Sequence, residues 1–447
     1  MHDVDASRER VVAAVRPFIF MITFWGPSYR QYFVDRCLAS LLAPGNFPQL
    51  HEQDGHRLLI ATTADDWRAI AQLPIMQAIR QYVTPIHLEI ESPGVTPAGS
   101  KAAILQQNRG QKLLLEAAYS YRSYGCMLWP DLIFSDGLCV ALQRWAAEGQ
   151  ELVLFASLRH VQESVLDELS ARGLLPHDAR PSLTCKPLVI PPRVLADISV
   201  RHLHPEVLVY EFEDSRIPIV PAHVYARVPN DAGIVMHTFH GQQIMMDFAT
   251  IEAHNTDCLS GALFEDVYVD ENFAGCRKIH IVRDSDEFGG LSLTPAAVGS
   301  FSGRQVADRS KHRQVFALSW RLRAALRYHT QENRFRIRRD IFRLPILWHA
   351  GEIDTVWNEK QAELEHIIER ITADFYTPAN ERPGVKPWIS LNPWRLIGDL
   401  VYKLYVERYY LRIMIAAACG NPATWRRIGR ALREVAFAKR PSINSGA

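Results

Sequence analysis

The sequence lacks the short motifs that mark several large enzyme classes. Its 447 residues contain no GxxxxGKS/T phosphate loop, no GxGxxG turn, no GxSxG elbow and no HExxH pair. These motifs build the ligand sites of P-loop NTPases, Rossmann dehydrogenases, α/β-hydrolases and zincins. Their absence weakens the assignment of the chain to any of these four classes.

Paired cysteines and a large net charge are also missing. Seven cysteines are scattered along the chain without a CxxC pair, and the formal net charge is +1. The cysteine usage gives no support to a zinc ribbon or a thioredoxin-like motif, and it favours free thiols in a reducing compartment. The near-zero charge provides no general basic field, so we predict no nucleic-acid partner.

Apolar runs long enough to cross a membrane are absent as well. Residues 1–10 are polar and mixed in charge, unlike a secretory signal, and the runs at 18–25 and 411–419 are too short for a span. We therefore expect a cytoplasmic protein and leave open a peripheral contact with a membrane.

What is present is the alternation of an α/β protein. Hydrophobic residues make up 48% of the chain, which is enough for a packed core. Apolar or β-rich runs alternate with stretches of helical spacing, and this order predicts a mainly parallel sheet flanked by helices. Ligands of such sheets bind outside the carboxyl ends of the strands. The predicted strands are 18–25, 57–63, 84–90, 126–129 and 152–156, and the predicted helices are 32–42, one starting near 67, and 101–124.

The second half changes character along its length. Residues 233–282 are β-rich, with strands predicted at 234–239 and 278–282, and residues 300–313 have the composition of a loop. Beyond them the spacing predicts helices. We therefore predict a ligand-binding domain at 15–295 and a helical C-terminal region at 314–440. The predicted C-terminal helices are 315–330, 358–375, 393–418 and 425–439.

Carboxylates stand where two of the predicted strands end. Asp131 and Asp136 follow the strand at 126–129, and Asp284, Asp286 and Glu287 follow the strand at 278–282. Carboxylate oxygens are the ligands that Mg²⁺ and Mn²⁺ prefer, and such an ion can bridge them to a diphosphate. The structural alternatives are an Asp-Gly turn at Asp136 with a capping role for Asp131, and a solvated acidic loop at 284–287.

Histidines and basic residues add further candidates. His237 and His240 lie on the predicted strand at 234–239 or just after it and could ligate a metal, although most such histidines are hydrogen-bonded core residues. Lys101, Arg109 and Lys112 lie on the predicted helix at 101–124 and could meet a diphosphate, or could be ordinary solvated charges.

Over about residues 18–290 these features resemble the nucleotide-sugar glycosyltransferases of the GT-A type. The resemblance rests on the opening strand 18–25 with Gly26, on the alternating strands and helices, and on the acidic element Asp131 to Asp136 roughly a hundred residues later. It implies a GT-A-like fold, a divalent metal (Mn²⁺ or Mg²⁺) and a nucleotide-sugar donor. The donor-binding residues that it implies are Thr23, Trp25, Gly26, Lys101, Arg109, Lys112, Asp131 and Ser135, and the metal ligands are Asp136, His237, His240 and Asp284.

The spacing leaves two metal motifs open. In the family the acidic element is of the Asp-x-Asp type, whereas Asp131 and Asp136 are further apart. Asp136 could then be the metal-binding residue of this element, and Asp131 could have a structural role. The strict Asp-x-Asp spacing occurs later, at Asp284 and Asp286.

The expected function is transfer of a sugar from a nucleotide-sugar to a glycan, lipid or small-molecule acceptor. Asp257, Asp286 or Glu287 could serve as the base toward the acceptor hydroxyl. The alternatives are a non-catalytic nucleotide- or carbohydrate-binding protein and a metal-dependent hydrolase. The predicted helix from Trp394 and the basic residues after it could dock on an anionic membrane or a lipid-linked acceptor, or could simply pack on the catalytic half.

Overall fold

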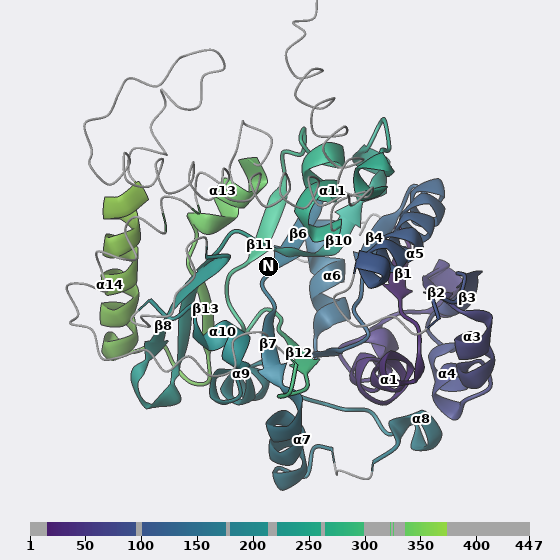
Figure 1. The fold of residues 1–447 in the computed structure, drawn as a ribbon, viewed down its shortest axis with the longest axis horizontal. Helices are drawn as coiled ribbons and strands as arrows, with labels where there is room; N and C mark the ends of the chain where they lie inside the picture. Colours follow the sequence, from purple (N-terminus) through teal and green to yellow (C-terminus); the bar gives the residue numbers. More distant parts are fainter. Residues whose placement is uncertain are drawn as a thin grey trace, which may run out of the picture.

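A seven-stranded mixed sheet forms the centre of the protein, in the order β11-β6-β10-β4-β1-β2-β3 (Figure 1). The computed structural model describes residues 16–94, 101–175, 179–212, 221–260, 264–298 and 336–372, together with Leu322 and Ala325. The strands of the sheet are β1 (Phe18–Thr23), β2 (Arg57–Thr62), β3 (Thr84–Glu89), β4 (Tyr124–Met127), β6 (Leu152–Phe155), β10 (Gln242–Asp247) and β11 (Ile279–Val282).

Most of this sheet is parallel, as the sequence predicts. β1 pairs in parallel with β2 and β4, β2 pairs in parallel with β3, and β11 pairs in parallel with β6. β10 alone runs antiparallel to its neighbours β4 and β6. The predicted α/β class is thereby confirmed. Because β10 reverses direction, the carboxyl ends of the other six strands lie along one edge of the sheet.

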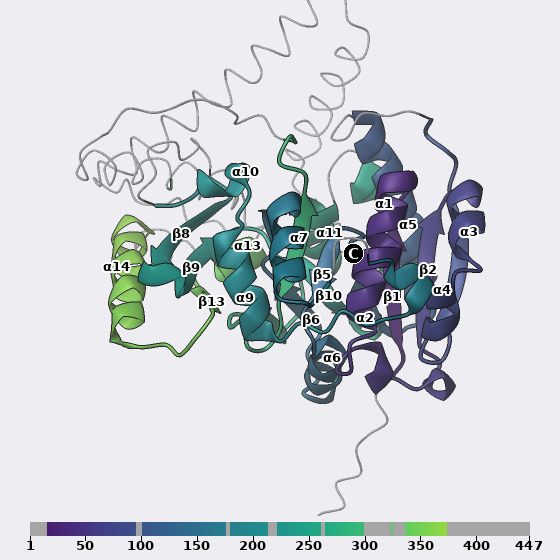
Figure 2. The same cartoon turned by 90° about the horizontal axis from the view of Figure 1, so that it is seen from below.

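Helices cover the sheet and its ends. Figure 2 shows α1, α3, α4 and α5 around β1 and β2, and α14 at the opposite end of the molecule. The helices are α1 (Pro27–Tyr32), a π-helix (Phe33–Cys37), α2 (Leu38–Leu41), α3 (Ala64–Ile70), α4 (Pro74–Ile79), α5 (Lys101–Ser120), α6 (Leu138–Ala147), α7 (Gln162–Ala171), α8 (Pro181–Thr184), α9 (Pro192–Arg201), α10 (Pro205–Leu208), α11 (Phe264–Asn272), α13 (Arg336–Phe342) and α14 (Thr355–Thr372). Within the described ranges no helix is both long and apolar enough to span a bilayer.

Two small sheets extend the central one. The first has the order β5-β12-β7 and the second has the order β13-β9-β8. Their strands are β5 (Leu132–Phe134), β7 (Leu158–Val161), β12 (Gly290–Thr294), β8 (His223–Val228), β9 (Gly233–Thr238) and β13 (Ile346–His349). Alternate residues of β8 enter different apolar clusters, with Val224 and Ala226 in one and Tyr225 in the other. Both faces of the second small sheet are therefore buried.

The C-terminal region differs in part from its predicted all-helical form. The helix predicted at 358–375 exists as α14, which begins at Thr355. Residues 346–349, however, form the strand β13, which pairs with β9. The apolar sequence Ile-Leu-Trp-His fits a buried strand, and its pairing with β9 is a tertiary contact that helical spacing cannot reveal. Apart from Leu322 and Ala325, the helices predicted at 315–330, 393–418 and 425–439 and the loop at 300–313 lie outside the described residues.

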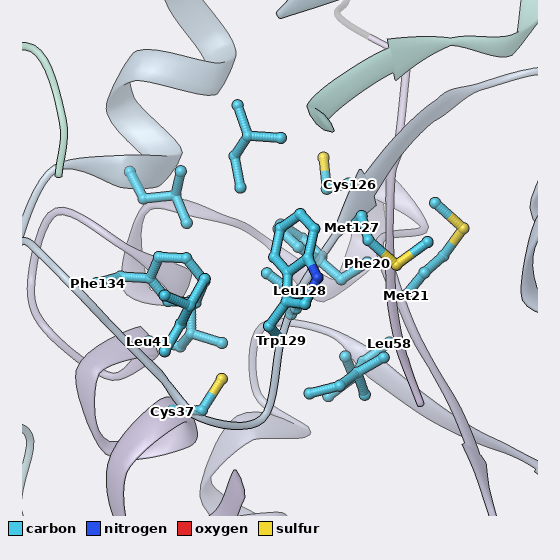
Figure 3. Packing of buried hydrophobic residues seen from close by; sticks show 14 of the residues in the cluster. Phe20, Met21, Cys37, Leu41, Leu58, Cys126, Met127, Leu128, Trp129 and Phe134 are labelled. Atoms are coloured by element: carbon cyan, nitrogen blue, oxygen red, sulfur yellow. The ribbon is translucent and has the colours of Figure 1, made fainter. Parts of the chain in front are cut away.

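A single large apolar cluster joins the central sheet to its helices. Figure 3 shows Trp129 in this cluster together with Phe20, Leu41 and Phe134. The Trp129 ring also meets the Phe155 ring edge-on, with 6.2 Å between the centroids. Burial of Trp129 anchors the segment that leaves the carboxyl end of β4.

α5 packs so closely on β1 that one of its positions has no room for a side chain. A Cβ on Gly110 would lie 2.2 Å from Thr23 Oγ1 and 3.1 Å from Thr23 Cβ. We expect Gly110→Ala to lower the free energy of unfolding by about 1–3 kcal/mol, because this overlap outweighs the helix propensity gained. Urea unfolding would measure the change. Adding Thr23→Ala should restore part of the loss, whereas purely additive losses would contradict the packing explanation.

Candidate functional site

The central sheet has a topological switch point between β1 and β4. From β1 the chain adds β2 and β3 on one side, and it then returns to place β4 on the other side of β1. In open α/β sheets ligands bind outside the carboxyl ends of the strands at such a point. Thr23 ends β1 and Met127 ends β4, so the residues that follow them are the first place to look for a ligand site.

Polar side chains from four elements gather beyond the end of β4. Asp131 follows β4, Tyr29 and Tyr32 lie at α1, Arg159 lies on β7 and Ser292 on β12. Asp131 accepts two hydrogen bonds from β12. The Oδ2 atom of Asp131 accepts a hydrogen bond of 2.8 Å from Ser292 Oγ, and its backbone carbonyl accepts one of 2.9 Å from Leu293.

The electrostatics of this group centre on Asp131. Burial raises the pKa of Asp131, and the hydrogen bond from Ser292 and the charge of Arg159 lower it by less. Burial and then the charge of Asp131 raise the pKa of both Tyr29 and Tyr32. A carboxyl whose charged form is disfavoured by its surroundings gains from a bound cation, and such perturbed groups concentrate at functional sites.

The residues at the end of β1 border the same point. Thr23 is buried, and its Oγ1 has no hydrogen-bond partner among the described residues. Trp25 is half-buried, and Gly26 has a φ of 83°, which favours glycine. The backbone N–H of Gly26 donates to Asp66 Oδ2 at 2.8 Å, so the turn is fixed to the start of α3. Thr23, Trp25, Gly26 and Asp131 thus lie at the two strand ends that flank the switch point.

Ser135 and Asp136 instead form hydrogen bonds with the backbone of neighbouring segments. Ser135 donates its N–H to the carbonyl of Gly289 at 2.9 Å, and its Oγ accepts from the Gly289 N–H at 3.0 Å. Asp136 Oδ1 accepts from the N–H of Gly45 at 2.6 Å. A Cβ on Gly45 would lie 2.8 Å from that same oxygen, so the two segments are in close contact. These contacts match the structural alternative for Asp136.

The three basic residues predicted to meet a diphosphate all lie on α5. Lys101 begins α5, and Arg109 is exposed. Lys112 Nζ lies 3.4 Å from Asp257 Oδ1, and the Asp257 side chain is 90% exposed. Asp257 is therefore a surface carboxylate paired with a lysine.

His237 is buried near the end of β9, and His240, just after it, is half-buried. His237 Nδ1 lies 2.9 Å from the carbonyl of Phe342, and its Nε2 has no hydrogen-bond partner within the described part of the chain. Burial lowers the pKa of His237 and of His240 to about 4, so both rings are neutral at pH 7. A neutral buried imidazole donating to a backbone carbonyl fits the predicted core role.

The structure places a histidine, which the sequence did not suggest, beside the acidic residues Asp284 and Asp286. Among the described residues, the one group of at least three His, Cys, Asp or Glu side chains close enough to share an ion is Asp284, Asp286 and His349. Asp284 is a predicted ligand, and His349 comes from β13. The prediction of Asp136, His237 and His240 as ligands gains no support from this grouping.

A cavity of about 510 Å³ opens beside this cluster. It is lined by Ile279, His280, Ile281, Arg283, Asp284, Glu287, Leu344 and Leu347. Glu287 accepts from Arg144 at 2.7 Å and lies 3.1 Å from His280 Nε2. Burial alone would raise the pKa of Glu287, but His280 and Arg144 together lower it.

Comparison with known protein families finds none that matches the chain, and a search of curated proteins also finds no match. The structure itself defines an α/β protein with a mostly parallel central sheet, two small sheets and a polar group at the switch point.

Three residues of these sites could not be found by motif or spacing. Arg159 lies on a short strand, Ser292 follows two glycines, and His349 lies far along the chain from Asp284. Only the pairing of β12 with β5 and β7, and of β13 with β9, brings them to the clusters.

Proposed function

We propose that the chain is a glycosyltransferase that binds the diphosphate of a nucleotide-sugar at Asp131. The observation that carries the proposal is the position of this carboxyl, outside the carboxyl end of β4 at the topological switch point. Trp25 and Gly26 lie just beyond the neighbouring strand end, where the base and ribose of the donor would be held, whereas Thr23 packs against Gly110 of α5.

The residues present fit a divalent cation that is shared with the donor. Mg²⁺ and Mn²⁺ are commonly held by one or two carboxylates together with substrate phosphates. Asp131 would supply the carboxylate; burial raises its pKa, so a bound cation would favour its charged form. The ion would neutralise charge on the departing diphosphate.

Arg159 and the tyrosines would complete the donor site. Arg159 is close enough for its charge to lower the pKa of Asp131, and its side chain is 57% exposed. Its guanidinium pairs with Glu206 at 2.8 Å and would have to turn from that carboxylate toward a phosphate. Tyr29 is 42% exposed and offers a ring face to a sugar or base.

Three carboxylates are candidates for the base that accepts the proton of the acceptor hydroxyl. Asp257 pairs with Lys112, Asp286 with Arg193, and Glu287 with Arg144. Each of these carboxylates would have to leave its cationic partner before accepting a proton. A nucleotide-binding protein without turnover would need no base, and turnover assays separate it from the enzyme.

The test is nucleotide binding with and without a metal. We expect one of UDP, GDP, ADP, CMP or dTDP, together with Mn²⁺ or Mg²⁺, to raise the melting temperature more than either component alone. A ligand at 100 times its Kd stabilises the native state by about 2.7 kcal/mol. Scanning fluorimetry of the full chain would measure the shift. If no pair of nucleotide and metal changes the melting temperature, the donor site is refuted. If a pair raises it but the matching nucleotide-sugar is not turned over, the chain is a nucleotide-binding protein without catalytic activity.

A further inference from the structure

We propose that Asp284, Asp286 and His349 form a second cation site, which binds a Zn²⁺ or Mn²⁺ ion in the absence of nucleotide. This site is separate from Asp131. β11, which leads to Asp284, stands three positions from β4 in the sheet. Asp131 is not among the side chains whose ligand atoms lie within 4.8 Å of one another at this cluster.

The three side chains have the separations that ligands of one ion require. His349 Nε2 lies 2.9 Å from Asp284 Oδ1 and 3.9 Å from Asp286 Oδ2. All three ligand atoms lie within 4.8 Å of one another. Ligands about 2.1 Å from a tetrahedral Zn²⁺ are about 3.4 Å apart, so small side-chain shifts would accommodate the ion.

The orientation of His349 suits a bound cation. Its Nδ1 lies 2.7 Å from the carbonyl oxygen of Gly351, which can only accept a hydrogen bond. Nδ1 therefore donates to this carbonyl, and Nε2 faces Asp284 and Asp286. His349 is only 3% exposed. A metal-bound histidine usually donates its other ring N–H to a carbonyl or carboxylate in this way.

The surrounding backbone and side chains hold the three residues in place. Ser285 donates its N–H to the Leu347 carbonyl at 2.9 Å, and its Oγ accepts from the His349 N–H at 3.1 Å. Arg193 makes a forked contact with Asp286, with its Nη2 2.9 Å from Oδ2. Ligating carboxylates are commonly oriented by such outer hydrogen bonds.

The charges and donor types select the ion. Arg193 pairs with both Asp286 and Glu352, so one guanidinium serves two carboxylates while Asp284 faces His349. Two carboxylate oxygens and one imidazole nitrogen suit Zn²⁺ or Mn²⁺ better than Mg²⁺ or Ca²⁺, which favour oxygen alone. The Asp284 and Asp286 side chains are each 40% exposed, which leaves room for water in the remaining coordination positions.

The ion would tie two sheets together. Asp284 and Asp286 follow β11 of the central sheet, and His349 ends β13 of the second small sheet. Because the unfolded chain holds these ligands far apart, binding adds to the stability of the native state by mass action.

The experiment uses the full chain, stripped of metal and free of nucleotide. Titration with Zn²⁺ and with Mn²⁺, followed by elemental analysis, should give one bound ion per chain and a higher melting temperature. Pulsed EPR of the Mn²⁺ form should show coupling to a histidine nitrogen. His349→Gln and Asp284→Asn should each weaken binding by at least about tenfold, because changes even to the groups that orient metal ligands cost about 10–100-fold.

Two control variants isolate the site. Glu287→Gln removes a neighbouring carboxylate outside the group and should leave the affinity within about twofold. Asp131→Asn should also leave it intact, so failure of the donor site and failure of this site are distinguishable. No bound ion, or Mn²⁺ without nitrogen coupling in the unaltered protein, would overturn the proposal, and neither measurement depends on the folding of a variant. Absence of an ion would mean that the contact between His349 Nε2 and Asp284 is an ordinary hydrogen bond.

Discussion

Replacing Asp131 by asparagine is expected to abolish metal-dependent nucleotide binding and to reduce turnover on the order of 100-fold or more. The amide cannot carry the charge that the cation requires, although its oxygen can still accept the hydrogen bond from Ser292. The fold should not suffer. Since burial raises the pKa of Asp131, the native state disfavours the charged carboxyl, and its removal should keep or raise the melting temperature.

Asp136→Asn is the matched control for this experiment. Asp136 lies just beyond β5 and accepts from the Gly45 N–H, which an asparagine oxygen can also do. Nucleotide binding and turnover should therefore remain close to those of the unaltered protein. If Asp136→Asn loses metal-dependent binding while Asp131→Asn retains it, the original prediction for Asp136 is right and the donor site proposed at Asp131 is wrong.

Gly233→Ala is expected to cost about 3 kcal/mol or more of folding stability. A Cβ at this position would lie 2.2 Å from the Trp348 carbonyl oxygen and 2.2 Å from the Trp357 ring. The first is backbone of β13, and the second belongs to a side chain that is only 1% exposed, so neither can move aside cheaply. Chemical denaturation would measure the loss.

The same substitution should disturb the second cation site. Gly233 is the register partner of His349, so displacing β13 moves the imidazole away from Asp284. Gly351→Ala is the control, since a Cβ there meets nothing within 4 Å and should change stability by no more than about 0.5 kcal/mol. Equal stability of the two variants would show that the contact at Gly233 is readily relieved.

The sequence was most informative where strands are apolar throughout. The runs at 18–25, 57–63, 84–90 and 152–156 became β1, β2, β3 and β6 with ends displaced by at most two residues. β1, β2 and β6 are buried on both faces, so hydrophobicity alone marks them, whereas β3 is a partly exposed edge strand. β10 was missed because its glutamines and methionines are not typical strand formers, and the contacts that make it a strand come from β4 and β6.

The candidate sites were predicted less completely, for a physical reason. Asp131 and Asp284 could be suggested because each follows a recognisable strand. The choice of Asp131 over Asp136 as the metal ligand depends on which carboxylate already accepts a backbone hydrogen bond. Asp136 accepts one from Gly45, which is distant in sequence. The place of His349 beside Asp284 follows from the bridge between Asp284 and Leu347, which no local pattern encodes.

The position of β10 also determines the order in which the molecule can be assembled during synthesis. β4 and β6 are not neighbours in the sheet, and β10, which joins them, is translated after both and after β8 and β9. A nascent chain that ends at Thr238 can pair β3, β2, β1 and β4, but the open edge of β4 and the whole of β6 then lack partners. Unpaired strand edges readily recruit other chains. Until Asp247 has emerged, therefore, the edge of β4 and both edges of β6 are open to pairing with other chains.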